Sequence, residues 1–217
     1  MKIFIIAATK FEIQPAITQL VNGNTSFFIT GIGMLATAVS LTKIILQGQP
    51  DLVIQAGIGG SYSKQISLGQ VVVVKQEFLG DMGVEEADIW KDIFDLNLIG
   101  DNDFPFAKKQ INNPYLPKLN VLQLVEVVGV TVNEISTSQQ RIEQLVSKYN
   151  PIIESMEGAV LHYVCTDLQV PYIQIRSISN YVGERDKSKW QMPLSIANLN
   201  NILVDIVNKL CSENNLL

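Results

Sequence analysis

Cysteine and histidine are scarce in this sequence. Its 217 residues include two cysteines and one histidine. Cys165 and Cys211 lie far apart, and their spacing fits no metal-binding or redox motif. His162 falls within an apolar helical stretch, where a histidine is usually part of the packed core. We therefore expect no zinc site and no disulfide framework, as is typical of a protein from a reducing cytoplasm.

Clusters of basic residues and long apolar runs are also missing. The net charge is −5 and the pI is about 4.9, which argues against nucleic acid or an anionic membrane as a partner. No apolar run approaches the roughly 20 residues that span a bilayer. The N-terminal stretch MKIFIIAATK is too short for a signal peptide. We expect a cytoplasmic protein with no membrane and no nucleic-acid partner.

Apolar residues are plentiful, at 47% of the sequence. They are sufficient for a sizeable core, and the length suits one domain over residues 1–217. Apolar, β-branched runs alternate with helical patterns, which favours an α/β fold with a largely parallel sheet. Strands are predicted at residues 2–8, 26–30, 52–56, 70–75, 121–132 and 170–177, and helices after Thr9, after Gly33, at 139–149 and at 191–210.

The chain is organised around residues 152–160, which read IIESMEGAV. A short apolar strand there ends in a turn and enters a helix. Met156 and Glu157 therefore fall at the carboxyl edge of the sheet, where open α/β folds bind ligands. Glu157 is either an acid in the first helical turn, favoured by the helix dipole, or a carboxylate that faces a ligand. Polar residues at other strand ends favour the second interpretation.

Three such ends carry similar features. Glu12 follows the first strand by one helical turn, and it too has the alternative of a first-turn acid. The stretch GIGG at 57–60 follows the strand at 52–56, and its glycines permit positive φ and offer backbone amides to a ligand. Asn180 follows the last strand. Because these ends share one edge of the sheet, the sequence predicts a ligand site there.

Two other stretches have open interpretations. Gly31, Gly33 and Ala36 spell G-x-G-x-x-A between a strand and a helix, as in dinucleotide-binding proteins. However, Asp51 precedes the next strand, whereas a ribose-binding acid should follow it; a glycine turn that packs a helix tightly explains the same residues. Residues 80–120 contain several prolines and no clear periodicity, and we interpret them as a lid or a subunit contact.

Together, Glu12, GIGG, SMEG and ISN resemble the purine nucleosidases of the methylthioadenosine/S-adenosylhomocysteine type, within the nucleoside phosphorylase superfamily. DMGVEE and SNYVGERD are more similar to its futalosine hydrolase branch, which serves menaquinone biosynthesis. The resemblance covers essentially the whole chain. It implies a three-layer α/β/α sandwich with a mixed, mostly parallel sheet, a nucleoside substrate, no cofactor or metal, and a homo-oligomer.

The resemblance also implies roles for individual residues. Glu12 holds the position of the carboxylate that activates water. Met156 packs against the ribose, Glu157 binds its hydroxyls, and the glycine loop lies under sugar and base. Ile135 stands in the segment that stacks on the base. The implied catalytic residues are Glu12 and Asn180, and the implied substrate-binding residues are Ala8, Gly57, Ile58, Gly59, Ile135, Met156, Glu157 and Ser179.

Asn180 is the main departure, because adenine-specific members have an aspartate that protonates N7 of the base. An amide is not a general acid, but it offers one donor and one acceptor. It can therefore meet O6 and a protonated N7 of hypoxanthine, whereas adenine leaves one group unpaired at about 1–3 kcal/mol. Asn180 thus favours futalosine as the substrate. Aminodeoxyfutalosine, methylthioadenosine and S-adenosylhomocysteine, all adenine nucleosides, stay as alternatives.

Water and phosphate are both nucleophiles in the superfamily. A phosphate site needs arginines, and this chain has only Arg141, Arg176 and Arg185, all in its second half. Glu12 would repel phosphate, so we predict hydrolysis; a phosphorylase is a rival. Arg185 is either a solvated charge or a partner for the 5′ carboxylate of futalosine, for which a lysine of residues 80–120 is another candidate. A nucleotide-binding protein without catalysis and a structural module are further alternatives.

Overall fold

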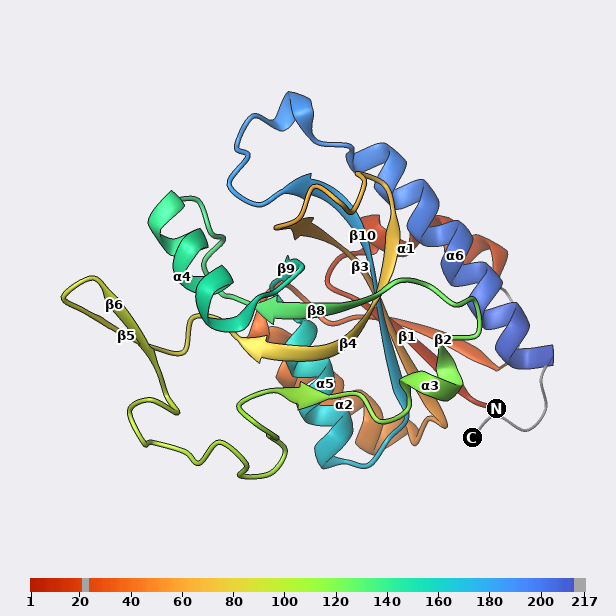
Figure 1. Cartoon of the computed structure of the whole chain (residues 1–217). Helices are drawn as coiled ribbons and strands as arrows, with labels where there is room; N and C mark the ends of the chain where they lie inside the picture. The colour runs from red at the N-terminus through yellow and green to blue at the C-terminus, as the bar shows by residue number, and fades with distance from the viewer. Residues whose placement is uncertain (21–23, 213–217) are drawn as a thin grey trace.

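The computed structural model describes residues 1–20 and 24–212. Within these residues, eight strands form one mixed sheet, and β5 (Gly83–Glu86) and β6 (Ile89–Asp92) form a separate hairpin (Figure 1). The strands of the main sheet are β1 (Ile3–Ala7), β2 (Thr25–Ile29), β3 (Leu52–Ser61), β4 (Val71–Leu79), β7 (Ile111–Asn112), β8 (Glu126–Thr131), β9 (Ile153–Ser155) and β10 (Tyr172–Tyr181).

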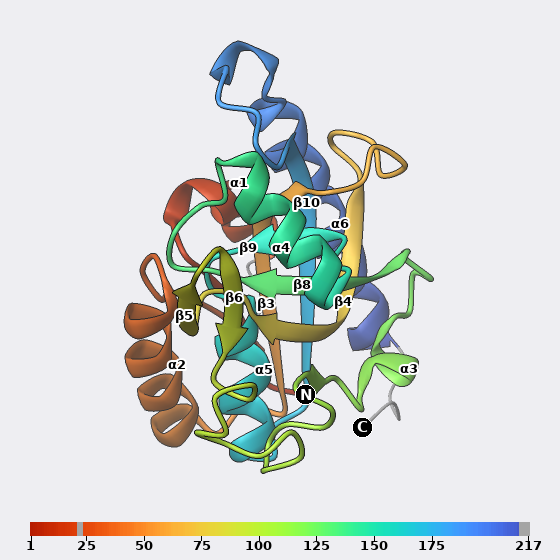
Figure 2. The same ribbon diagram turned by 60° about the vertical axis from the view of Figure 1, so that its left-hand side comes forward.

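Two pairs of helices cover the sheet. On one face lie α1 (Lys10–Gln19) and α6 (Met192–Ser212), and on the other lie α2 (Met34–Gly48) and α5 (Gly158–Asp167) (Figures 1 and 2). Strand β1 explains this arrangement, because it is apolar on both faces. Ile3 and Ile5 pack toward α1 and α6, and Phe4 and Ile6 pack toward α2 and α5. A strand that is apolar on both faces needs a cover on both sides. The expected three-layer sandwich is confirmed.

Five of the strands close into a ring. Strand β3 pairs with β10, β10 with β4, β4 with β8, β8 with β9, and β9 with β3. The β10–β4 and β9–β3 pairs are antiparallel and the other three are parallel, so the sheet is mixed and mostly parallel, as expected. The ring itself was not predicted, since closure depends on pairing between distant segments.

Several strand boundaries differ from the sequence prediction. Strand β3 does not end at Ala56 but continues through GIGG to Ser61, and β10 continues past Ser177 to Tyr181. Strand β8 begins only at Glu126, whereas residues 121–132 were predicted. The first two extensions have the same cause, because β3 and β10 pair with each other along their full length and so stabilise polar and glycine positions as strand.

Residues 80–120 contain more structure than predicted. The β5–β6 hairpin packs on α4 (Gln139–Tyr149), where the Arg141 guanidinium lies 4.2 Å from the centre of the Trp90 ring. At the end of β6, Asp92 forms an ion pair with Lys148 of α4 at 3.2 Å. The segment ends with β7 and the short helix α3 (Leu116–Leu119). Among the described residues, no helix has the length and apolarity needed to cross a membrane.

Candidate active site

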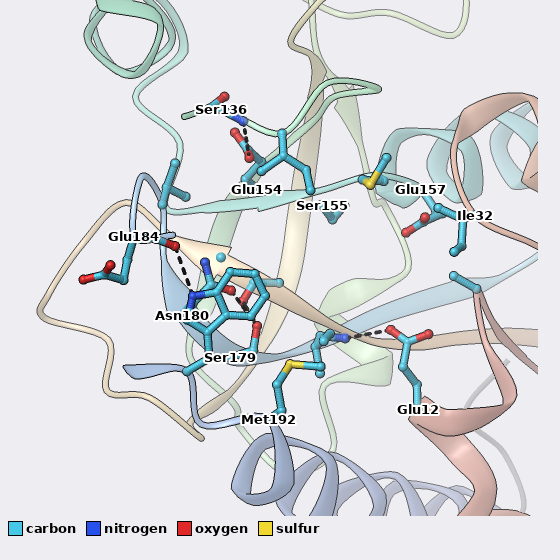
Figure 3. A pocket seen from close by; sticks show the side chains of 18 of the residues that line it. Glu12, Ile32, Ser136, Glu154, Ser155, Glu157, Ser179, Asn180, Glu184 and Met192 are labelled. Carbon is cyan, nitrogen blue, oxygen red and sulfur yellow. Dashed lines mark hydrogen bonds between the residues drawn. The ribbon is translucent and has the colours of Figure 1, made fainter. Parts of the chain in front are cut away.

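A cavity of about 400 Å³ opens at the carboxyl ends of β3 and β10, a size typical of small-molecule sites. Its floor follows β3 from Ile58 to Gly60, about 7 Å of strand. Figure 3 shows side chains from separate elements converging on it. The residues that line it include Ala8, Phe11, Glu12, Ile32, Ile58, Gly59, Gly60, Ile135, Ser136, Glu154, Met156, Glu157, Ser179, Asn180, Glu184, Arg185, Trp190 and Met192.

Glu12 lies at one end of this floor and is held by three donors. Its Oε2 accepts hydrogen bonds from the N–H and the hydroxyl of Thr9, both at 2.9 Å, and its Oε1 accepts one from Ile58 N–H at 3.1 Å. Thr9 is the residue that caps α1, so Glu12 also satisfies the open end of that helix. A carboxylate has about four acceptor positions, and one therefore stays open on Oε1.

Glu157 faces the same end of the cavity from the N-cap position of α5. Its Oε1 accepts a hydrogen bond from Gly33 N–H at 3.0 Å, and its Oε2 lies 3.8 Å from Nη1 of Arg176. Burial raises the pKa of Glu157 above the usual carboxyl value, while the Arg176 guanidinium and the Gly33 amide oppose that rise. The ion pair therefore favours the charged carboxylate in a buried place.

Arg176 is a supporting residue that the sequence prediction missed. It is only 2% exposed, lies on β10 beneath Glu157, and donates from Nη2 to Gln55 Oε1 at 2.9 Å. The sequence analysis mentioned it only as one of three arginines in the second half of the chain, whose small number and position argued against a phosphate site. Its guanidinium instead neutralises Glu157 from behind, and it is not among the residues that line the cavity.

The glycines of β3 let neighbouring groups pack closely against the strand, and they do not form a turn. None of Gly57, Gly59 and Gly60 has positive φ, so the expected glycine loop is wrong. A Cβ at Gly57 would lie 2.3 Å from Arg176 Nη1, and one at Gly59 would lie 2.9 Å from the Glu154 carbonyl oxygen. Gly57 also sits behind the cavity wall instead of lining it, contrary to prediction. Gly60, which was not predicted, takes its place.

The turn at residues 31–33 supports Glu157. Gly31 and Gly33 have φ of +89° and +86°, values that suit glycine. A Cβ at Gly31 would lie 3.0 Å from that of Ala36, and the Gly33 amide holds Glu157. Asp51 lies at the start of β3, the opposite end from the cavity, where it accepts a hydrogen bond from Lys2 N–H at 2.6 Å. These contacts favour tight packing over a dinucleotide site.

Asn180 lies at the other end of the cavity floor with a defined amide orientation. Its Oδ1 accepts a hydrogen bond from Ser179 Oγ at 2.8 Å, and its Nδ2 donates to Tyr181 O at 3.1 Å. Turning the amide over would set its oxygen against the Tyr181 carbonyl, so the contacts assign the two atoms. One N–H and one oxygen lone pair are left for a ligand.

Several lining residues were not foreseen. Glu154 lies on β9 and Ser136 in the loop between β8 and α4, and Trp190 and Met192 lie where α6 begins. Trp190 donates from Nε1 to Glu184 O at 3.0 Å, and Arg185 lies 5.6 Å from its ring. Of these residues, only Glu154, the acid two positions before Met156, could have been noticed from the local sequence. The others depend on how distant segments fold together.

Residues 80–120 do not reach the site. All of them are described, and none lines the cavity, which argues against a lid formed by the same chain and against a lysine of that segment as a ligand there; the subunit contact stays a prediction. They support the site at a distance: Asp81 Oδ2 accepts hydrogen bonds from the N–H groups of Asn133 and Glu134, next to Ile135. Ile135 itself is 45% exposed at the cavity.

The charge around the cavity is mostly negative. Four carboxylates line it, those of Glu12, Glu154, Glu157 and Glu184, against one cation, Arg185. His162 is the core residue expected, fully buried with Nδ1 3.1 Å from Ile111 O, and burial lowers its pKa to about 3. In the part of the chain that the structure describes, no three His, Cys, Asp or Glu side chains gather as metal ligands.

Comparison with known proteins agrees with this geometry. The family described as the phosphorylase superfamily matches residues 12–208. Futalosine hydrolase of Thermus thermophilus is 28% identical over 169 residues, which cover 75% of this chain and 72% of that protein. Futalosine hydrolase of Streptomyces coelicolor is 29% identical over 183 residues, which cover 81% and 72%.

Adenine-type relatives match as well. A 5′-methylthioadenosine/S-adenosylhomocysteine nucleosidase of Bacillus velezensis is 25% identical over 162 residues, which cover 71% of this chain and 67% of that protein. Among solved structures, the native futalosine hydrolase of Helicobacter pylori superposes with a TM-score of 0.78 over 96% of this chain and 98% of its own. At 21% identity, that likeness shows a shared fold.

Proposed function

The chain belongs to the phosphorylase superfamily, and from this premise we propose that it hydrolyses the N-glycosidic bond of futalosine. The products are hypoxanthine and dehypoxanthine futalosine, a step of menaquinone biosynthesis. The observation that carries the proposal is the arrangement of Glu12 and Glu157 at one end of a cavity and Asn180 at the other. The identity to two futalosine hydrolases supports the choice of substrate.

Glu12 is the general base in this proposal. The open acceptor position on Oε1 receives a proton from the attacking water. The three donors from Thr9 and Ile58 fix the carboxylate in place, so it does not have to reorganise during the reaction. Ala8 and Ile58 border the same end and keep it narrow.

Glu157 and Met156 bind the ribose. As the bond between C1′ and N9 stretches, the sugar gains oxocarbenium character and positive charge. Glu157 accepts hydrogen bonds from the hydroxyls and places negative charge near that developing cation. Arg176 and Gly33 hold the carboxylate from behind. Met156 packs against the sugar, and Ile135 covers the base with an aliphatic surface.

Asn180 stabilises the leaving base. Its free N–H meets O6 of hypoxanthine, and its free lone pair meets N7–H once solvent has protonated that nitrogen. Ser179 and Tyr181 hold the amide in the orientation that this requires. Once its N7 is protonated, adenine offers two donors at this edge, N7–H and the amino group, so one of them is left without an acceptor.

Water is the nucleophile because the cavity is poorly suited to phosphate. Oxyanion sites use arginines, and the one cationic side chain that lines the cavity is Arg185, an exposed residue on the side of Asn180. Glu12 and Glu157 occupy the end where phosphate would have to attack. We expect turnover without phosphate and no requirement for a metal or organic cofactor.

Product analysis by liquid chromatography tests the proposal. The purified protein is incubated with futalosine, inosine or methylthioadenosine, each with and without phosphate. Hypoxanthine from futalosine alone, at a rate that phosphate does not change, is the expected result. Adenine from methylthioadenosine would instead favour the second candidate, a methylthioadenosine/S-adenosylhomocysteine or aminodeoxyfutalosine nucleosidase, which relatives of that name support. Ribose 1-phosphate products would identify a phosphorylase.

We also infer a homo-oligomer in the cytoplasm. Apolar side chains are exposed beside the mouth of the cavity, among them Phe11 at 65%, Ile32 at 63% and Leu35 at 81%. Such a patch is typical of a subunit contact. Both cysteines are free thiols, which suits a reducing compartment. Light scattering coupled to size-exclusion chromatography measures the oligomeric state, and a monomer at micromolar concentration would contradict it.

A further inference from the structure

Glu154 is a buried carboxylate at the cavity that the proposed mechanism does not use. It lies on β9, is 6% exposed and lines the cavity. Its Oε1 accepts a hydrogen bond from Ser136 N–H at 3.1 Å, and its Oε2 accepts one from the Tyr62 hydroxyl at 2.5 Å. Burial first, and the charge of Glu154 second, raise the pKa of Tyr62, so this phenol stays a donor.

The sheet places Glu154 opposite Asn180. Gly60 of β3 pairs with Glu154 of β9 on one side and with Asn180 of β10 on the other. Paired residues on neighbouring strands project to the same face. With strands about 4.8 Å apart, the two flanking Cα atoms are on the order of 10 Å apart. Figure 3 shows the two side chains on different sides of the cavity.

Glycine keeps the space between these two side chains open. A Cβ at residue 60 would lie 3.4 Å from Asn180 Nδ2 and 3.1 Å from Val182 Cγ2. Because Gly60 has no side chain, the floor between the amide and the carboxylate is flat backbone. A planar purine lying on that floor would present one edge to Asn180 and a neighbouring edge to Glu154.

An ionised carboxylate can only accept hydrogen bonds. Of its roughly four acceptor positions, Ser136 and Tyr62 fill two, so a ligand must bring a donor to the others. The 6-oxopurines have such a donor, N1–H, next to the O6 atom that Asn180 meets. Adenine has an unprotonated N1 there, and two acceptors face to face repel each other.

We propose that Glu154 is a specificity-determining residue that accepts a hydrogen bond from N1–H of a 6-oxopurine base. This assignment rests on the proposed function and adds a second base contact to that of Asn180. Ser136, whose N–H holds Glu154 Oε1 in place, is 2% exposed and also lines the cavity, so the carboxylate is fixed at the cavity wall.

Binding of free bases tests the contact without any mutation. Titration calorimetry compares hypoxanthine with 1-methylhypoxanthine, in which a methyl group replaces the N1 proton. We expect the methylated base to bind at least about tenfold more weakly, because it leaves Glu154 unpaired. Equal affinity for the two bases would overturn the role of Glu154.

The variant Glu154→Gln tests which side chain is responsible. Glutamine keeps the shape of the side chain and adds an N–H donor, which suits N1 of adenine. Futalosine and aminodeoxyfutalosine share their 5′ group and differ in the base, so their kcat/KM ratio isolates base recognition. We expect the variant to lower the futalosine to aminodeoxyfutalosine ratio at least about tenfold, and to bind hypoxanthine and 1-methylhypoxanthine more evenly.

The matched control is Glu126→Gln, the same change at an exposed position at the start of β8. It should leave the ratio unchanged. If the wild-type enzyme releases hypoxanthine but Glu154→Gln leaves the futalosine to aminodeoxyfutalosine kcat/KM ratio unchanged, the role of Glu154 is contradicted and the proposed function is not. Failure of the wild-type enzyme to release hypoxanthine would contradict the proposed function itself.

Discussion

At the scale of single residues, the geometry allows Glu12 both of the roles that the sequence presented as alternatives, the first-turn acid and the proposed general base. Glu12 satisfies the first turn of α1 through Thr9, and it reaches the cavity with an acceptor position still open. Helix capping and general-base catalysis are compatible because they use different lone pairs of one carboxylate. Asn180 is similar, because Ser179 and Tyr181 orient its amide and leave one N–H and one oxygen lone pair open for a ligand.

Replacement of Glu12 separates these two roles. In Glu12→Gln, one oxygen becomes an amino group that cannot accept a proton, so we expect kcat on futalosine to fall about 10²–10⁴-fold. The loss of an acceptor for Thr9 or Ile58 should lower the free energy of unfolding by about 1–3 kcal/mol and leave the protein folded. Steady-state kinetics and thermal unfolding measure the two effects. Turnover near that of the wild type would rule out the general base.

Replacement of Asn180 tests the reading of the base. In Asn180→Asp, a carboxyl group takes the place of the amide and can carry a proton to N7. We expect the kcat/KM ratio of futalosine to aminodeoxyfutalosine to fall on the order of tenfold, because the donor to O6 is lost and a proton donor to N7 is gained. The same chromatographic assay measures it. An unchanged ratio would mean that the base is recognised elsewhere.

At the scale of elements, the glycines of β3 bring the strand against the buried groups behind the site. Gly57 is in contact distance of both Arg176 and Glu12, and no side chain fits between them. A local glycine pattern is compatible with a loop or with a crowded strand. The glycine stretch is a strand and not a loop because β3 pairs with β10 along its length.

The variant Gly57→Ala should disturb the site and the fold together. Its Cβ would fall 2.3 Å from Arg176 Nη1 and 3.0 Å from Glu12 Oε1. We expect a loss of about 1–3 kcal/mol in the free energy of unfolding, as is typical of overpacking, and a fall in kcat. Urea denaturation and kinetics measure these changes. The control Ser147→Ala, on the exposed face of α4, should stay within about 0.5 kcal/mol.

At the scale of the whole molecule, the layers bury a carboxylate between the sheet and α5. Glu77 of β4 is fully buried, accepting hydrogen bonds from Gln174 Nε2 at 2.9 Å and from the Thr131 hydroxyl at 3.0 Å. The oxygen of that hydroxyl in turn accepts a hydrogen bond from the backbone N–H of Ala159, in the first turn of α5. Burial raises the pKa of Glu77 from 4.5 to about 7.

This shift makes stability depend on pH. Between pH 4.5 and about 7, the unfolded chain has lost the Glu77 proton and the folded protein has kept it. The contribution of Glu77 to the free energy of unfolding therefore falls as pH rises through that window, on the order of 1 kcal/mol per pH unit. Glu77→Gln cannot titrate, so its stability relative to the wild type should rise from pH 5 to pH 7 in urea denaturation. A constant difference would contradict the prediction.

The sequence by itself determined the elements and most of the strand-end residues. Strand β1, helix α4 and the turn at Glu157 were predictable because periodicity, small residues and caps act between neighbours in the chain. For the same reason, the sequence alone assigns Glu12, Met156, Glu157 and Asn180 to one edge of a largely parallel sheet. The resemblance to the nucleosidases implied the three layers, which agree with a strand that is apolar on both faces and must be covered on both.

Only the tertiary structure decided what stands opposite what. The ring of five strands, the ion pair of Arg176 with Glu157 and the position of Glu154 across Gly60 from Asn180 all join segments far apart in the chain. No local pattern encodes such pairing, because it is selected by the packing of whole layers and the matching of buried polar groups. The proposed catalytic residues could therefore be predicted from the sequence, whereas the proposed second contact to the base could not.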